Sequence, residues 1–307
     1  MKTAMGLILG VAFLVAAPVV AQETSAERRI EEVRFSSGQV ELAGRLWLPP
    51  GPGPHPAVVF LPGSGQSIRN LDLDPDPIPY HFADHGVAYL AWDKRGVRDS
   101  GGEFIPLPDT NASAQEDRLR VLAGDAVAAM RYLATRRDVD AARIGAWAFS
   151  QGGWVAPLLE AVGGEPAFVI VVGGPAVTIG EELRYSELAD AARQRSRDGG
   201  GAISMPDLYQ ELEQARGAGA DFGGFDPARH WKNTTAPTLF LLGEWDLSVP
   251  TARSVERLER LSATSPWIDY RVFPRATHGV AERDAAGQST SLRTSSRRNT
   301  TSSITWG

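Results

Sequence analysis

The chain has 307 residues, of which 43% are hydrophobic and 22% charged, with 32 glycines and no cysteine. This composition is typical of a folded globular protein. The lack of cysteine excludes disulfide bonds, thiolate nucleophiles, zinc ribbons and iron–sulfur clusters. A formal net charge of −6 provides no basic field, so we do not expect nucleic acid as a partner.

Residues 1–21 have the pattern of a secretory signal peptide. Lys2 precedes the apolar segment 5–17, and Ala21 provides a small residue for cleavage. The apolar segment is shorter than the roughly 20 residues that a membrane-spanning helix needs. We therefore predict a bacterial exported protein, periplasmic or secreted, with no stable membrane anchor after signal cleavage.

Short apolar segments alternate with longer segments of helical periodicity over residues 30–280. Residues 30–48 alternate apolar and polar side chains around Ser37 and Gly38, which predicts a hairpin. Further strands are predicted at 57–61, 87–91, 144–149, 168–172, 238–242 and 267–273, and helices at 114–136 and 151–162. Most of these strands are apolar on both faces, as in a parallel sheet covered by helices. The pattern predicts an α/β fold with a mostly parallel, doubly wound sheet.

Residues 176–232 interrupt this alternation. They contain helical stretches at 181–197 and 206–216, joined by a glycine-rich segment. This connection is too long for a simple crossover, so we predict a mobile helical cap over the site, with a surface excursion of no functional consequence as the alternative. Residues 22–286 then form a single domain. We expect residues 287–307, which are rich in Ser and Thr, to be disordered.

The strand at 144–149 runs into Ala148-Phe-Ser150-Gln-Gly152, which predicts a nucleophile elbow. In this strand-to-helix turn, small neighbours allow close backbone approach and the Ser hydroxyl is lifted out of the sheet. The usual pattern is Gly-x-Ser-x-Gly, and Ala148 replaces its first glycine. The backbone N–H of Gln151 is expected at a helix N-terminus, where negative charge is favoured.

A nucleophilic Ser needs a base and a group that orients this base. In a site of this kind the chain order is Ser, then the acid, then His. Of five histidines only His278 lies beyond the last predicted strand, and His230 at the end of the cap is the alternative. Asp246 follows the penultimate strand, and Glu244 is less well placed. We predict a catalytic triad of Ser150, Asp246 and His278.

A glycine-rich turn, Pro62-Gly63-Ser64-Gly65, follows the strand at 57–61. Backbone N–H groups in such a turn can face a reaction centre and stabilise the negative charge of an acyl-transfer transition state. We predict that the N–H groups of Ser64 and Gln151 form an oxyanion hole. A tight link between strand and loop is the alternative interpretation of this turn.

These segments give the chain a resemblance to the serine α/β-hydrolase superfamily, and within it to exported bacterial hydrolases of the dienelactone-hydrolase and prolyl-oligopeptidase-like branch. The motifs that carry the resemblance are Leu61-Pro-Gly-Ser-Gly65, Asp93-Lys-Arg-Gly-Val-Arg-Asp-Ser-Gly-Gly102, Val139-Asp-Ala-Ala-Arg-Ile-Gly145, Ser150-Gln-Gly-Gly153, Gly243-Glu-Trp-Asp246 and His278-Gly279. They cover roughly residues 30–280. The resemblance implies the α/β-hydrolase fold, and it implies that Asp93 and Arg95 are a structural pair in a loop near the site.

Three features depart from the family pattern. Ser150 stands where dienelactone hydrolases have Cys, and no propeller domain precedes the hydrolase segment. Polar sequence follows Val280, where family members usually have a C-terminal helix packed on the sheet. A shifted reading frame or a truncation would produce this C-terminus, and the loss of a helix would expose apolar sheet surface.

The predicted function is hydrolysis of carboxylic esters through an acyl-enzyme on Ser150, with a small acyl compound as substrate and no metal or organic cofactor. A peptidase, a thioesterase or an acyltransferase would use the same triad, because fold and triad do not distinguish leaving groups. The alternative from another class is an inactive exported binding protein with a damaged C-terminus. Trp154 and Trp245 adjoin the nucleophile and the acid, which favours apolar or aryl acyl groups.

Overall fold

The computed structural model describes residues 28–69, 77–107, 111–280, 282–283 and 289–290. The predicted signal peptide lies outside these residues. Of the segment expected to be disordered, only β10 (Ser289–Thr290) is described, and it pairs with β9 (Glu282–Arg283). None of the described helices is both long enough and apolar enough to cross a membrane.

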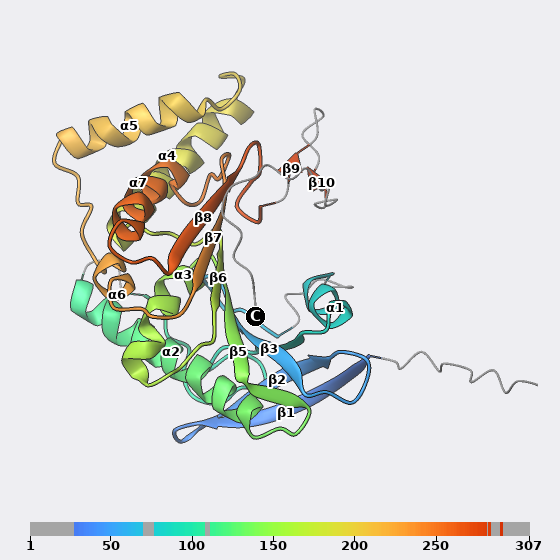
Figure 1. Ribbon diagram of the computed structural model, residues 1–307. Helices are drawn as coiled ribbons and strands as arrows, with labels where there is room; N and C mark the ends of the chain where they lie inside the picture. Colours follow the sequence, from blue (N-terminus) through green and yellow to red (C-terminus); the bar gives the residue numbers. More distant parts are fainter. Residues whose placement is uncertain (1–27, 70–76, 108–110, 281, 284–288, 291–307) are drawn as a thin grey trace, which may run out of the picture.

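An eight-stranded sheet forms the centre of the described structure, in the order β1-β2-β4-β3-β5-β6-β7-β8 (Figure 1). β1 and β2 form an antiparallel hairpin and β2 is antiparallel to β4, whereas all other neighbours are parallel. The predicted hairpin and mostly parallel sheet are thereby confirmed. The strands are β1 (Arg29–Ser37), β2 (Val40–Leu48), β3 (His55–Leu61), β4 (Ala88–Trp92), β5 (Val139–Phe149), β6 (Val169–Val172), β7 (Thr238–Gly243) and β8 (Ile268–Phe273).

The described helices cover the two faces of the sheet unequally (Figure 1). One face packs against α2 (Ala112–Ala134), α3 (Gly152–Val155), α6 (Ala228–Trp231) and α7 (Thr251–Ser262). The other face packs against α1 (Pro77–Asp84), which contacts β2 and β4. On this second face Ile170 of β6 and Leu241 of β7 are only partly buried. The segment in which the resemblance places a covering C-terminal helix lies largely outside the described residues.

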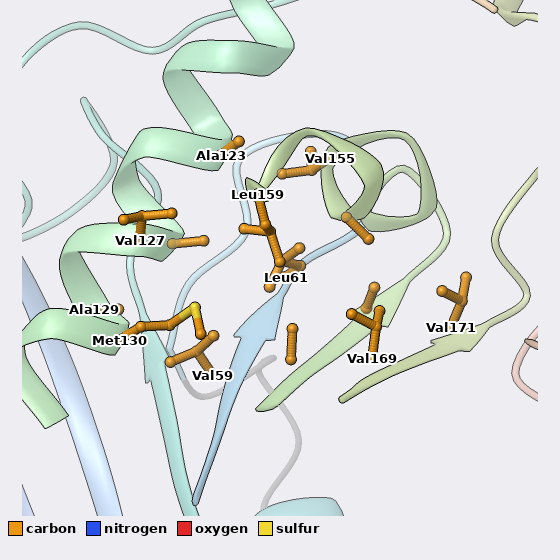
Figure 2. Packing of buried hydrophobic residues seen from close by; sticks show 14 of the residues in the cluster. Val59, Leu61, Ala123, Val127, Ala129, Met130, Val155, Leu159, Val169 and Val171 are labelled. Atoms are coloured by element: carbon orange, nitrogen blue, oxygen red, sulfur yellow. The ribbon is translucent and has the colours of Figure 1, made fainter. Parts of the chain in front are cut away.

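The larger core lies between α2 and the central strands. Figure 2 shows side chains of α2, such as Val127 and Met130, directed toward Val59 and Leu61 of β3. The burial of each such side chain stabilises the fold by roughly 1.5–3 kcal/mol. This packing fixes the carboxyl ends of β3 and β5, from which the predicted oxyanion and nucleophile turns emerge.

The helix predicted at 151–162 is interrupted. The structure contains the short α3, followed by 3-10 turns at Ala156–Leu158 and Glu160–Val162. Pro157 causes the change, because it has no backbone N–H and its ring conflicts with a regular helix, so that a tighter turn is favoured.

Two longer helices, α4 (Ile179–Arg197) and α5 (Met205–Gly217), occupy the insertion between β6 and β7. They pack against each other around a small separate cluster that includes Tyr185 and Leu208. Thr178 caps α4 by accepting a hydrogen bond from the backbone N–H of Glu181. These helices coincide with the helical stretches expected at 181–197 and 206–216.

Candidate active site

Ser150 occupies a strained turn between β5 and α3. Its φ is 53°, in the left-handed region that residues other than glycine rarely adopt. Ser150 N donates to Val172 O at 3.1 Å, and Gly153 N donates to Ser150 O at 2.8 Å. A Cβ on Gly152 would lie 2.3 Å from Leu61 O, so the turn requires glycine at that position. A nucleophile elbow has this combination of strain and close backbone approach.

Asp246 and His278 are joined by a hydrogen bond in the loops that follow β7 and β8. Nδ1 of His278 lies 2.8 Å from Oδ2 of Asp246. Asp246 is fully buried, and its Oδ1 accepts hydrogen bonds from the backbone N–H groups of Ser248 and Val249 at 2.7 and 2.9 Å. These two bonds fix the carboxylate and leave Oδ2 to the imidazole.

Two glycines allow the loop that carries His278 to lie close to the strand ends. A Cβ on Gly173, which follows β6, would lie 2.2 Å from the carbonyl oxygen of His278, and a Cβ on Gly243 of β7 would lie 2.3 Å from another carbonyl of this loop. The His278 ring packs against Phe149, with ring centroids 5.0 Å apart. Because Phe149 directly precedes Ser150, the imidazole and the Ser hydroxyl share one edge of the sheet.

The Ser150 hydroxyl makes no hydrogen bond with His278 within the described residues. Such catalytic hydrogen bonds are often long in the absence of a substrate and tighten when it binds. The structure therefore joins Asp246 to His278 by a hydrogen bond. It also places Ser150 directly after Phe149, whose ring packs against His278.

The alternative acid and base lie elsewhere. Glu244 is exposed, and it accepts a hydrogen bond from the backbone N–H of Arg275 at 3.2 Å. His230 lies on α6, which leads into the amino end of β7, and its Nε2 is 3.3 Å from Oε1 of Glu116. Ser150 follows the carboxyl end of β5, so His230 lies toward the opposite edge of this parallel sheet.

Ser150 lines a cavity of about 340 Å³, a size suited to a small ligand. Ser64 and Gln151 line the same cavity. Among the described residues, neither backbone N–H of this pair has a hydrogen-bond acceptor. Both donors are therefore available to an oxygen atom of a ligand.

The cavity walls are mainly apolar. Phe104, Ile105 and Leu107 come from the loop that follows β4, and Trp154 comes from α3. The indole N–H of Trp154 donates to Val177 O at 3.0 Å, so its ring is fixed against the cavity. Trp245, by contrast, is 46% exposed and is not among the described lining residues. The prediction that Trp245 contributes to the pocket wall is therefore wrong.

Lys94 connects the two segments predicted to form the oxyanion hole. Its buried ammonium group donates to Gly63 O at 2.5 Å, to Gly65 O at 3.1 Å and to Gln151 Oε1 at 3.0 Å. In a trans peptide the C=O and the following N–H point in opposite directions. The bond to Gly63 O therefore turns the N–H of Ser64 away from Lys94. Burial lowers the pKa of Lys94 to about 8.

The expected pairing of Asp93 with Arg95 is wrong, because each residue has a different partner. Asp93 is fully buried and accepts a hydrogen bond from Arg69 N at 2.8 Å, while Arg95 Nε donates to Asp125 Oδ2 at 2.8 Å. Both still have a structural role in this loop. Lys94, between them, is the residue that the sequence interpretation missed. Its position, two residues beyond the end of β4, places it near the edge of the sheet that carries the site, but no local pattern indicates which groups its ammonium binds.

The helix α4 holds the loop that carries the acid. The hydroxyl of Tyr185 donates to the carbonyl of Asp246 at 2.6 Å, and the hydroxyl of Ser186 donates to the carbonyl of Ser248 at 2.8 Å. Glu182, one turn earlier on α4, lines the cavity beside Ser150. The insertion is thus in contact with the site, which argues against a surface excursion of no consequence.

The model of the alpha/beta hydrolase family matches residues 58–287, which is most of the chain. An esterase from Pyrococcus furiosus superposes with a TM-score of 0.57 at 17% sequence identity, over 82% of this chain and 85% of that one. A hypothetical protein from Pseudomonas aeruginosa superposes with a TM-score of 0.52 at 18% identity, over 83% of this chain and 88% of that one.

A puromycin-hydrolysing peptidase from Mycobacterium tuberculosis superposes with a TM-score of 0.54 at 21% identity, over 83% of this chain but only 36% of that one. No curated protein matches the sequence significantly. At these identities the structural likeness is one of fold and says nothing about the substrate. The family match over most of its length, together with the sheet and the elbow at the end of β5, shows that this chain belongs to the alpha/beta hydrolase family.

Proposed function

We propose that this hydrolase cleaves carboxylic esters of small acyl compounds with Ser150 as its nucleophile. The observation that carries the proposal is the 2.8 Å bond between His278 and Asp246 at the edge of the sheet where Ser150 is held in its left-handed turn. His278 takes the hydroxyl proton as the Ser150 oxygen attacks the acyl carbonyl. Asp246 fixes the imidazole tautomer and stabilises the imidazolium.

The second half of the proposed reaction reverses these proton transfers. The imidazolium of His278 gives its proton to the leaving alcohol, and the acyl group stays on the Ser150 oxygen as an ester. His278 then takes a proton from a water molecule that attacks this ester, and returns the proton to Ser150 as the carboxylic acid leaves. The apolar walls beside Ser150 support an apolar acyl group, because they desolvate it on binding.

The oxyanion of the tetrahedral intermediate is proposed to bind the backbone N–H groups of Ser64 and Gln151. Donors that are fixed before the reaction stabilise the charge that develops in the transition state. Lys94 is a positioning residue in this proposal, since it holds the carbonyls and the side chain of these two segments and does not reach the substrate itself.

We expect Lys94→Met to lower kcat for p-nitrophenyl butyrate by about 10²-fold, the typical effect of losing one oxyanion donor, with little change in KM. Lys232→Met is the matched control, because Lys232 is exposed, and its kcat should stay within about twofold of the wild type. A folded Lys94→Met protein with wild-type kcat would contradict the positioning role.

The same lysine predicts a pH dependence. Because the pKa of Lys94 is about 8 in the folded protein and not the ordinary 10.5, its ammonium group loses a proton as the pH rises through about 8. A neutral amine has two donors for three acceptors, so the Gly63–Gly65 turn loosens. We expect kcat of the wild type to decline above pH 8. The decline should be absent from the pH profile of Lys94→Met.

Labelling with a fluorophosphonate probe tests the nucleophile and the base together. We expect the probe to modify Ser150 in the folded protein, as mapped by peptide mass spectrometry, and not in the heat-unfolded protein. His278→Ala should slow labelling by about 10³-fold or more, because the hydroxyl then has no base. His230→Ala is the matched control and should be labelled at the wild-type rate. Labelling that depends on His230 instead would overturn the proposed base.

A further inference from the structure

Glu182 brings a carboxylate without a cationic partner to the cavity that contains Ser150. It lies in the first turn of α4, and it is the only ionisable side chain among the described residues that line the cavity. No ion pair joins it to any Arg, Lys or His in the described part of the chain. Placing a carboxylate in a largely apolar site without a counterion costs stability.

The preceding residue shows how this helix neutralises a buried carboxylate elsewhere. Glu181 is almost fully buried and has three guanidinium partners around it. These are Arg216 at 2.8 Å, Arg253 at 3.1 Å and Arg257 at 3.7 Å. Residues adjacent in a helix point about 100° apart, so Glu181 faces α5 and α7 whereas Glu182 faces the cavity. Glu182 therefore has no cationic partner because it faces the cavity, whereas the arginines lie on the side of the helix that Glu181 faces.

The hydrogen bonding of Glu182 is also incomplete. Its one described hydrogen-bond partner is the hydroxyl of Ser186, which lies 3.2 Å from its Oε1. That hydroxyl has a single proton, and its shorter contact, at 2.8 Å, is to the carbonyl of Ser248. The carboxylate thus keeps acceptor positions that a ligand in the cavity can fill.

The charges around Glu182 act in opposite directions. Burial raises its pKa to about 7, the Ser186 hydroxyl and the nearby imidazole of His278 act to lower this pKa, and the carboxylate of Asp246 acts to raise it. Near neutral pH the group is thus balanced between its charged and neutral forms. A cation in the cavity would favour the charged form and recover the free energy that burial costs.

We propose that Glu182 binds a cationic group of the substrate, so that the cavity accepts esters in which an apolar acyl chain is combined with an ammonium group. This inference rests on the proposed ester hydrolysis at Ser150. It names the substrate class that the site prefers: cationic esters over neutral esters of the same shape.

A pair of esters of nearly equal shape tests the inference. Butyrylcholine carries a fixed positive charge, and 3,3-dimethylbutyl butyrate has carbon in place of the nitrogen. We expect Glu182→Gln to reduce the ratio of their kcat/KM values, charged over neutral, by about tenfold relative to the wild type, which is the typical effect of losing a contact to a charged group. Because the comparison is between variants, any intrinsic difference in the reactivity of the two esters cancels.

Glu187→Gln is the matched control. Glu187 lies on the same helix, is exposed and pairs with Arg184 at 2.7 Å outside the cavity. Its substitution removes one negative charge from α4 without reaching the site, so the ratio should equal that of the wild type. An equal fall of the ratio in both variants would show a general charge effect and overturn the inference.

The pH dependence of the ratio is a readout that a structural role would not change. Between pH 6 and 8 the wild-type ratio should rise as Glu182 loses its proton, because the quaternary ammonium group does not titrate. Changes with pH in the catalytic steps that the two esters share cancel in the ratio. In Glu182→Gln the ratio should be flat over this range, and a rise of the same size there would overturn the inference.

Binding to Ser150→Ala separates this inference from the proposed function, because that variant cannot form an acyl-enzyme. Calorimetry should show tighter binding of butyrylcholine than of the neutral ester, and Ser150→Ala/Glu182→Gln should lose the difference. If this binding difference is observed but the wild type hydrolyses neither ester, the cation site is supported and the proposed esterase activity is contradicted. If both esters are hydrolysed, and the ratio of their kcat/KM values is the same in the wild type and in Glu182→Gln, the esterase activity is supported and the cation site is contradicted.

Discussion

Ser150→Ala is expected to lower kcat for p-nitrophenyl butyrate by about 10⁴-fold or more, since a hydrolase of this type loses its covalent pathway with its nucleophile. The residual rate would come from the cavity and the two backbone donors, which the substitution leaves in place. KM should change little, because the apolar walls that bind the acyl group do not depend on the hydroxyl. Steady-state kinetics on the purified protein measure both parameters.

The fold should survive this substitution. Alanine accepts the turn at φ 53° about as well as serine does, and the hydroxyl makes no hydrogen bond with a described residue. Thermal unfolding should therefore occur within a few degrees of the wild type. Ser262→Ala, near the exposed end of α7, serves as the control and should keep full activity. Substantial turnover by a folded Ser150→Ala protein would refute the assignment of the nucleophile.

Most of the parallel strands were predictable because their apolar residues are continuous, whereas the hairpin was predictable from its alternation of apolar and polar residues. The turn at Ser150 was predictable because an apolar strand runs into a serine with small residues, Ala148 and Gly152, two positions before and after it. The helices α1 and α7 were not anticipated. In α1 the signal is weak, because Pro77 and Pro79 stand in its first turn and the segment is short. In α7, charged residues outnumber the few apolar residues that mark its buried face.

The roles proposed for Lys94 and Glu182 could not be predicted from their neighbours in the sequence. Lys94 follows a strand in a charged loop, and its function arises only where β3 and β5 bring Gly63 and Gln151 to its ammonium group. Glu181 and Glu182 are consecutive and chemically identical, yet their surroundings differ. The helix directs one of them to the arginines of α5 and α7 and the other to the cavity, and that division depends on how the insertion packs.

Asp246→Asn should lower kcat by about 10⁴-fold, through the tautomer of His278. The position of the amide is set by the protein: two backbone N–H groups, at 2.7 and 2.9 Å, hold Oδ1, so the amide oxygen will take that place. The NH₂ group then faces Nδ1 of His278, at a distance of 2.8 Å in the wild type. Nδ1 must accept this hydrogen bond, and the ring proton moves to Nε2. The imidazole can then no longer take the proton of Ser150.

Glu244→Gln is the matched control, because it also replaces a carboxylate by an amide, two residues away in the same loop. Glu244 is exposed and its carboxylate contacts the backbone of Arg275. Its substitution should leave kcat within about twofold of the wild type, in line with other exposed positions. If Glu244→Gln instead caused the large loss and Asp246→Asn did not, the bond between Asp246 and His278 would not orient the base. The proposed triad would then need a different acid.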